Sequence, residues 1–476
     1  MTGITATHAT RAAGVLALAC LLAAASPGAF AQDAAAGTHT VAAISATDTA
    51  RDTTASGSAT WRAWVLGTQL DVIGQHLAPF HSPYSGPNSL TAVGDTKVSH
   101  AYGVYLGARI AGGVQAYLDI EMVRGSGVSH VTGLGGLTNG DVIRQGTANL
   151  GQDPYIARAF LRYAIPLAHG ATDTLVRGVD QIPLVTETQR VEITAGRLAV
   201  SDLMDLNRYA GSTRLQFQNW GLWQNTAWDF AADTRGYSND VAIAWFAPRW
   251  VLRVASFQMP TQANGNEFDG RILQDRGDQA ELTLMPARVG TIVRLMAYLN
   301  HGRMGVYDEA LEIAHETGQA PDIVADDKPG RRKYGFGLNL EQPLADSGET
   351  GVFARLGWDD GATESFAFTE VDRHVSAGVQ VSGAHWSRRD DRLGVGAVSH
   401  GLSSPHREYL EAGGIGFLLG DGRLDYARET IVEAYYRMQL GSFIEVSPDY
   451  QRIWNPGYNR DRGPAVVYAV RLNVRY

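Results

Sequence analysis

The chain is dominated by stretches of about ten residues in which apolar and polar side chains alternate. The last stretch, 465–476, has one apolar face made of Val466, Tyr468, Val470, Leu472, Val474 and Tyr476, and its other face holds Arg471, Asn473 and Arg475. Successive side chains of a strand point to opposite faces, so this pattern predicts a strand with one apolar and one wet side. The length also suits a strand that crosses a bilayer, which takes about 9–11 residues.

Similar alternation recurs along the chain and predicts an all-β, outer-membrane antiparallel barrel of about sixteen strands with long extracellular loops. The strands are expected near 61–73, 100–111, 113–124, 153–166, 190–200, 236–247, 250–258, 278–286, 289–300, 333–343, 350–358, 366–385, 392–401, 428–440, 442–454 and 464–476. An even number puts both chain ends on one side of the barrel. Short connections at 247–249, 286–288, 345–348 and 441 then fall together at this periplasmic end.

The polar faces of the expected strands are densely charged. Strand parity assigns to the lumen Asp119, Glu121, Arg158, Arg162, Arg294, Arg355, Glu433, Arg437 and Arg471. A soluble sandwich also alternates and remains the alternative, but its wet face rarely holds so many arginines and carboxylates in register. A barrel lumen can be charged in this way. Each of these side chains could instead form an ion pair that braces the wall.

The longest connection, 201–235, holds the densest group of polar and aromatic residues. The group contains Arg214, Gln216, Asn219, Trp220, Trp223, Asn225, Trp228, Asp229 and Arg235. One interpretation is a loop that folds into the lumen and offers rings and hydrogen-bond donors to a solute. The other is a loop that braces the wall, with tryptophans as ordinary packing. Both narrow the pore. A second insert, 307–317, has helical spacing and ends at Gly318, which predicts an extracellular helix.

Aromatic residues at expected strand ends fit the interfacial girdles of a membrane barrel. They are Trp61, Trp64, Trp250, Tyr334, Trp358 and Tyr476. The glycine-rich run 133–140 resembles a nucleotide-binding loop, but no strand–helix–strand context surrounds it, so we expect a flexible extracellular loop. His385, His400 and His406 are expected to be loop or rim residues and not metal ligands.

Composition narrows the class of protein. Charged residues make up 19% and hydrophobic residues 45% of the 476, which argues against a disordered chain. Beyond residue 31 no run approaches the ~18 consecutive apolar residues of a transmembrane helix. The net charge of −9 argues against nucleic acid as a partner.

The first 31 residues have the pattern of a secretory signal. Arg11 precedes a long apolar run, and residues 29–31 (Ala-Phe-Ala) form a small-x-small cleavage site. A lipoprotein anchor at Cys20, the one cysteine of the chain, is the alternative. We therefore expect a signal peptide at 1–31, a flexible leader at 32–58 and the barrel domain at 59–476.

Five motifs together resemble the carbohydrate-selective porins of the OprB type from Gram-negative bacteria. They are 233–237 (Asp-Thr-Arg-Gly-Tyr), 333–342 (Lys-Tyr-Gly-Phe-Gly-Leu-Asn-Leu-Glu-Gln), 351–358 (Gly-Val-Phe-Ala-Arg-Leu-Gly-Trp), 420–426 (Gly-Asp-Gly-Arg-Leu-Asp-Tyr) and 448–458 (Pro-Asp-Tyr-Gln-Arg-Ile-Trp-Asn-Pro-Gly-Tyr). The resemblance implies passive diffusion of mono- and oligosaccharides through a constriction lined by arginines, carboxylates and aromatic rings. It also implies that the aromatic C-terminal residue, Tyr476, marks the chain for the barrel-assembly machinery.

The expected function is therefore an outer-membrane sugar porin. A general diffusion porin and a structural or adhesive barrel with a closed lumen are the alternatives. The expected partners of the protein are transported sugars, outer-membrane lipid and the assembly machinery. The sequence does not decide between a monomer and an oligomer. The chain has no His-Glu-x-x-His, Gly-x-Ser-x-Gly or Walker motif, so we expect no enzyme, catalytic residue, metal or cofactor. Because the polar faces mix both charge signs, we expect weak ion selectivity.

Overall fold

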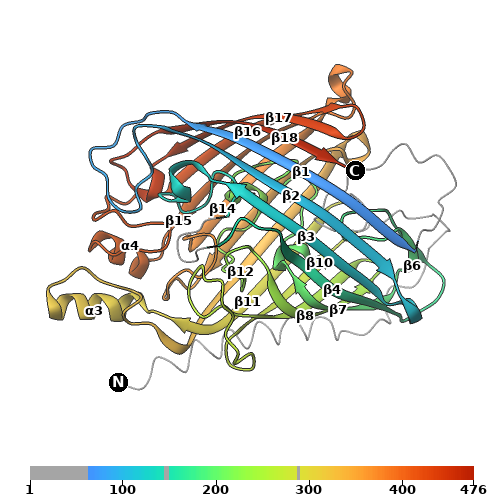
Figure 1. Ribbon diagram of the computed structural model, residues 1–476, viewed down its shortest axis with the longest axis horizontal. Coiled ribbons are helices and arrows are strands. Elements are labelled where there is room, and N and C mark those ends of the chain that lie inside the picture. The colour runs from blue at the N-terminus through green and yellow to red at the C-terminus, as the bar shows by residue number, and fades with distance from the viewer. Residues whose placement is uncertain (1–62, 144–149, 287–289) are drawn as a thin grey trace.

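A computed structural model describes residues 63–143, 150–286 and 290–476, in which sixteen strands form one closed antiparallel barrel (Figure 1). The strands are β1 Trp64–Leu77, β2 Asp95–Arg109, β3 Gln115–Gly125, β4 Tyr155–Pro166, β7 Arg190–Leu198, β8 Ser238–Ala247, β9 Trp250–Gln258, β10 Arg276–Leu284, β11 Ile292–Met304, β12 Lys328–Ala345, β13 Thr350–Asp359, β14 Arg373–Ser382, β15 Arg392–Gly401, β16 Glu429–Leu440, β17 Ile444–Trp454 and β18 Ala465–Arg475. The expected barrel is confirmed, with a strand at each expected place. The signal, the leader and Trp61 lie outside the described residues.

The barrel closes where its first and last strands pair. Gln69 of β1 lies opposite Arg475 of β18, and the antiparallel register continues to Leu77 opposite Val467. Asn473 reinforces the seam from inside by donating a 2.8 Å hydrogen bond to Asp71. Because the ladder is continuous, the barrel sheet has no open edge that could pair with another chain.

The wall is apolar outside and polar inside, as the alternation predicts. On β18, Tyr468 and Val470 are 53% and 55% exposed, whereas Arg471 and Asn473 are buried at 1% and 2%. The outer face is thus suited to lipid, and the charged side chains of the strands are directed into the lumen. Trp245 and Trp250 also meet on the wall, with ring centres 5.4 Å apart.

The alternation fails at one point on β4. A bulge shifts the register, so that Asp119 pairs with Arg158 but Ile120 pairs with Ile156. Strict alternation along 153–166 predicts Tyr155 on the same apolar outer face as Leu161 and Tyr163, and this prediction is wrong. Ile156 is outside instead, 53% exposed, and the Tyr155 hydroxyl lies 3.5 Å from Glu121 inside the barrel. A bulge adds one residue to a strand and so reverses the parity beyond it.

Both chain ends of the barrel, before β1 and after β18, lie at one end of it, which we call the terminal end; the opposite end is the loop end. The loop end carries helices α3, Tyr307–Thr317, and α4, Ser404–Glu411 (Figure 1). The predicted helix at 307–317 is confirmed, and Gly318 ends it in the left-handed conformation with φ 70°. No helix among the described residues is long and apolar enough to span a membrane.

Most connections at the terminal end are short, but the one at 167–189 contains a hairpin of β5, Thr172–Leu175, and β6, Leu184–Glu187. This hairpin was not predicted. Its two strands pair only with each other and stay outside the barrel sheet.

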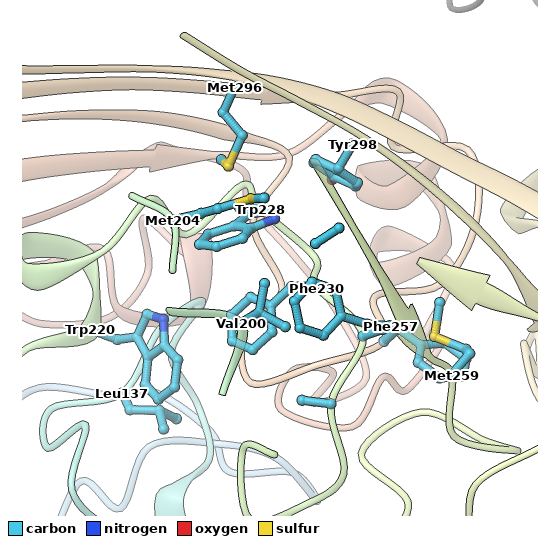
Figure 2. Packing of buried hydrophobic residues seen from close by; sticks show 14 of the residues in the cluster. Leu137, Val200, Met204, Trp220, Trp228, Phe230, Phe257, Met259, Met296 and Tyr298 are labelled. Atoms are coloured by element: carbon cyan, nitrogen blue, oxygen red, sulfur yellow. The ribbon is translucent and has the colours of Figure 1, made fainter. Parts of the chain in front are cut away.

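The lumen is filled by the connection between β7 and β8, residues 199–237, which we call the inner loop. Its side chains form a buried apolar cluster with the wall: Figure 2 shows Trp228 and Phe230 near Phe257, Met296 and Tyr298. The Trp228 ring is 1% exposed. The core of this protein therefore lies inside the barrel, between loop and wall.

The glycine-rich run 133–140 also packs into the lumen, so its expected flexibility is wrong. Leu134 and Leu137 are each 3% exposed. The carbonyl of Thr138 accepts hydrogen bonds from Gln75 of β1 at 3.0 Å and from Gln451 of β17 at 2.8 Å. Two buried leucines and these amide contacts fix the run against the wall.

Candidate functional site

Arginines of the wall hold the inner loop in place. Arg355 of β13, which is fully buried, donates to the carboxylate of Asp205 at 3.1 Å and to the carbonyls of Ala210 at 2.7 Å and Leu222 at 3.0 Å. Arg471 of β18 donates to two further loop carbonyls. These charge-assisted bonds satisfy backbone groups that the lumen would otherwise leave without a partner.

Carboxylates of the wall hold the same loop by its N–H groups. Glu433 of β16 accepts from the backbone of Gln218 at 2.5 Å and of Asn219 at 3.0 Å. Glu341 of β12 accepts from Arg208 N at 2.7 Å and lies 3.5 Å from Arg294 of β11. The structure therefore places Arg355, Glu433 and Arg471 in direct contact with the loop, and Arg294 beside Glu341, which also contacts it.

A pair of glycines makes room for the loop to touch the wall. Gly337 of β12 and Gly357 of β13 lie opposite each other in the sheet. A Cβ on Gly357 would collide with the side-chain oxygen of Asn225, and one on Gly337 would lie 2.8 Å from its nitrogen. Only a strand without side chains at these two positions lets the inner loop approach so closely.

Two further predicted residues lie in the packed part of the inner loop. Trp228 donates a 2.8 Å hydrogen bond from its ring nitrogen to Gln279 of β10. The Asp229 carboxylate accepts from Ala367 N at 2.8 Å and lies 3.1 Å from the ammonium of Lys333 on β12. Both residues are placed as packing and bracing groups.

Beside the braced loop lies a cavity of about 190 Å³, which we call the main cavity. It lies between the inner loop and the wall of β1 to β4. Its polar and aromatic lining includes Gln69, Tyr105, Glu121, Asp141, Tyr155, Arg158, Ser201, Asp202, Thr213, Arg214, Trp220, Trp223, Phe230, Arg235, Tyr237 and Phe368. Of the residues that the sequence assigned to the lumen or grouped in the 201–235 connection, it contains Glu121, Arg158, Arg214, Trp220, Trp223 and Arg235.

Arg214 of the inner loop bridges the main cavity to the wall. Its guanidinium donates to Asp141 at 2.8 Å, Tyr105 at 2.9 Å, Gln69 at 3.0 Å and Glu121 at 3.3 Å. The partners come from three strands and a neighbouring loop. This bridge fixes the distance between loop and wall at the level of the cavity.

Arg158 forms the second charged centre, among four carboxylates. Its guanidinium lies 2.7 Å from Asp202, 3.3 Å from Asp119, 3.4 Å from Asp180 and 3.9 Å from Glu121. Asp180 comes from the 167–189 connection, so this cluster joins wall, inner loop and terminal end. Burial raises the pKa of Asp180, and the neighbouring Asp202 adds to this effect.

Aromatic rings form the apolar part of the cavity lining. Trp220 stacks on Phe368 with ring centres 5.0 Å apart and planes at 11°, and Trp223 lies 5.0 Å from Trp220. The guanidinium of Arg235 lies 4.3 Å above the Tyr155 ring. The lining therefore combines rings with guanidinium groups, which suits a solute with both hydroxyl edges and apolar faces.

The sequence did not identify several of the lining residues. Tyr105 lies on the inward face of the strand expected at 100–111, so strand parity could have found it. Tyr237 ends the motif 233–237 and donates a 2.6 Å hydrogen bond to Glu121. Asp141 carried no such signal, because a loop residue has no face to be read from periodicity.

The remaining predicted residues lie away from the main cavity. Arg162 of β4 stands over the Tyr117 ring at 5.1 Å and contacts the 167–189 connection. Arg437 of β16 lies 3.6 Å from Glu445 in the wall near the terminal end. Asp119 is fully buried beneath Arg158. These three support the walls and the floor of the lumen.

The histidines singled out from the sequence pair with carboxylates. His385 lies 3.0 Å from Asp346, and the buried His400 lies 3.2 Å from Glu429. His406 lies 3.1 Å from Asp372 and stacks on Tyr307 with ring centres 4.5 Å apart. Within the described residues, no group of three or more His, Cys, Asp or Glu side chains could hold a metal ion.

A closed sixteen-stranded barrel with an apolar outer surface and a charged lumen narrowed by an inward loop is the architecture of an outer-membrane porin. The chain belongs to the OprB family of carbohydrate-selective porins, whose sequence model matches residues 116–476. It is an outer-membrane carbohydrate porin, and thus a transport channel.

One solved structure shows the same fold, and two others are more distant matches. The high-pH structure of OprB from Pseudomonas putida has a TM-score of 0.64 and 16% identity, with 87% of this chain and 94% of that chain covered. Its low-pH structure has a TM-score of 0.41 and 12% identity, covering 87% and 93%. The outer-membrane channel DcaP of Acinetobacter baumannii has a TM-score of 0.45 and 10% identity, covering 87% and 97%. No curated protein matches the chain.

Proposed function

We propose that sugars cross this porin through the main cavity, and that the residues around Arg214 and Arg158 form the constriction. The observation that carries the proposal is the Arg214 bridge, which joins the inner loop to the wall and narrows the lumen to a space of about 190 Å³. A cavity of about 10–15 Å³ on this measure already holds one water, so the space has room for many waters. A solute of monosaccharide size would fill it.

The chemistry of the lining matches a neutral polyol. A sugar that leaves water must replace its hydrogen bonds, and conduction requires these replacements to be weak enough to release it. Arginine donates and carboxylate accepts, so the two together can serve every hydroxyl group. Trp220 and Trp223 supply flat apolar surfaces. The fixed ion pairs hold the width of the constriction without a conformational change.

Filling the main cavity tests this path. Ser201 lines the cavity, and Ser201→Trp places an indole within it. We expect glucose-driven swelling of proteoliposomes to stop, because the added ring occupies the space that the sugar needs. Ser85→Trp, at an exposed position of the connection between β1 and β2, is the matched control and should swell like the parent protein. Unchanged swelling in the Ser201→Trp variant would place the sugar path elsewhere.

The biogenesis of the barrel follows from its two ends. We infer that the 1–31 segment directs export and is removed, and that the assembly machinery recognises the last strand. Tyr476 is 70% exposed while its backbone pairs with Thr68 of β1 at 3.0 Å in both directions, so its ring stays accessible beside the closing seam. Tyr476→Ala should lower the yield of heat-modifiable barrel in outer membranes, and an unchanged yield would contradict this role.

A further inference from the structure

The 167–189 connection folds inward and reaches far from the strands that it joins. Arg177 donates a 2.6 Å hydrogen bond to the carbonyl of Leu66 on β1, although the connection itself leaves from β4. Ile182 is fully buried, and its N–H donates to the hydroxyl of Tyr117 on β3 at 3.3 Å. The connection thus covers part of the lumen at the terminal end.

Behind this connection lies a second cavity of about 110 Å³, which we call the terminal cavity. One side is the hairpin, and the other is the wall of β7, β8 and β9 with the start of the inner loop. Its polar lining consists of Arg162, Asp173, Gln181, Thr188, Arg190, Glu192, Thr194, Asp202 and Arg253. Its apolar lining includes Leu203, Met204, Leu206, Phe246, Val251 and Met285.

Guanidinium groups are held over an aromatic ring in the terminal cavity. Arg190 stands 3.9 Å from the centre of the Phe246 ring and is fixed by Asp173 at 2.8 Å and Glu192 at 2.6 Å. Arg253 lies 5.5 Å from the same ring, 3.8 Å from Glu281, and makes a long bond of 3.4 Å to Thr283. A guanidinium has five donors, so Arg253 can offer hydrogen bonds to a solute.

The charges of this lining balance. The lining contains three arginines, Arg162, Arg190 and Arg253, and three carboxylates, those of Asp173, Glu192 and Asp202. To bind an anionic amphiphile, the terminal cavity would need an excess of positive charge, and its equal numbers of arginines and carboxylates do not provide one. A neutral solute with many hydroxyl groups and one apolar face meets donors and acceptors on one side and leucine, methionine and valine on the other.

The two cavities meet at Asp202, which lines both. Its carboxylate forms a bidentate pair with Arg158, 2.7 Å to Nε and 2.8 Å to Nη2. A sugar that leaves the main cavity past this pair enters the terminal cavity. We propose that the terminal cavity is a second sugar-binding site, on the periplasmic side of the constriction; the proposal rests on the proposed function of the main cavity.

Protection of engineered thiols by glucose tests this site. Thr188→Cys places a thiol in the terminal cavity, and Thr213→Cys places one in the main cavity. Thr174→Cys is the matched control, because this exposed residue lies on the same hairpin between the inward-facing Asp173 and Leu175. The one native cysteine, Cys20, lies in the 1–31 segment that we infer is removed, so each mature variant carries a single thiol. The readout is the rate at which a small water-soluble thiol reagent modifies the folded porin, with and without glucose.

Glucose at ten times its Kd should slow modification of both cavity variants about tenfold, because the free fraction falls by one plus the ratio of concentration to Kd. The Thr174→Cys variant should react at the same rate with and without glucose. Protection of Thr213→Cys alone would overturn the second site and leave the main path intact. Protection of neither cavity variant would contradict both, and a Thr188→Cys thiol that never reacts would show a closed cavity and overturn the second site.

Discussion

Arg355→Met removes the strongest attachment of the inner loop while keeping a long side chain in its place. The substitution deletes one buried ion pair and the bonds to three loop carbonyls. Removing one partner of a buried ion pair costs about 3–5 kcal/mol, because the other charge remains buried without compensation. At about 4 kcal/mol the equilibrium between docked and released loop shifts by roughly a thousandfold. The population of molecules with a released loop should therefore rise by about this factor.

Single-channel recording and liposome swelling measure the result. We expect a higher conductance and a ratio of glucose to amino-acid entry that approaches one, while the barrel stays heat-modifiable because its sheet is untouched. Arg332→Met, an exposed position of β12, is the control. Adding Asp205→Asn to Arg355→Met should recover part of the stability, since it removes the buried charge that lost its partner. If the variant has the conductance and selectivity of the parent protein, Arg355 does not hold the inner loop in the lumen.

Three further predictions follow from named contacts. Gly357→Val should displace Asn225 and raise the conductance, as the loss of Arg355 should. A variant that conducts like the parent would show that the inner loop stays docked without its close approach to the wall at Gly357. Trp223→Ala should reduce the preference for sugars over amino acids in swelling assays, whereas Trp245→Ala on the outer wall, 43% exposed, should not; equal effects would count against a ring contact with sugar. Burial raises the pKa of Glu364, in the connection between β13 and β14, from 4.5 to about 8. The folded state therefore holds this proton more tightly, so the stability that it adds is complete below the unfolded pKa and is lost as the pH rises through about 8. The thermal stability of the Glu364→Gln variant should not show this pH dependence. An equal pH slope of stability in the variant and the parent would exclude Glu364 as its source.

The fold could be predicted because lipid and lumen impose a period of two on every strand. Nothing comparable acts on the connections. The alternation of the last strand describes its faces residue by residue, whereas the bulge that turns Tyr155 inward depends on the pairing of β4 with β3. The hairpin at 172–187 was missed because its strands are only four residues long and their alternation is too short to distinguish from a turn.

The site could be predicted only in part, since strand parity shows which side chains point inward but not what they meet. Arg355 was expected inside and is there, yet its partners lie 150 and 145 positions earlier in the chain. Arg158 shows the same inward parity and lines the cavity. The path of the inner loop decides whether an arginine braces the loop or lines the cavity. The sequence did not predict this path, because it allowed both a loop that contacts a solute and a loop that braces the wall.

A sugar-adapted constriction is tested most directly by the swelling of proteoliposomes that contain the purified protein, in isotonic glucose and in amino acids of similar size. We expect glucose to enter faster than the amino acids, because the constriction offers balanced donors, acceptors and rings to a neutral polyol. Equal entry rates would contradict a sugar-adapted constriction and indicate a general diffusion pore. No entry of either solute would indicate a closed barrel, in which the inner loop serves only as a core.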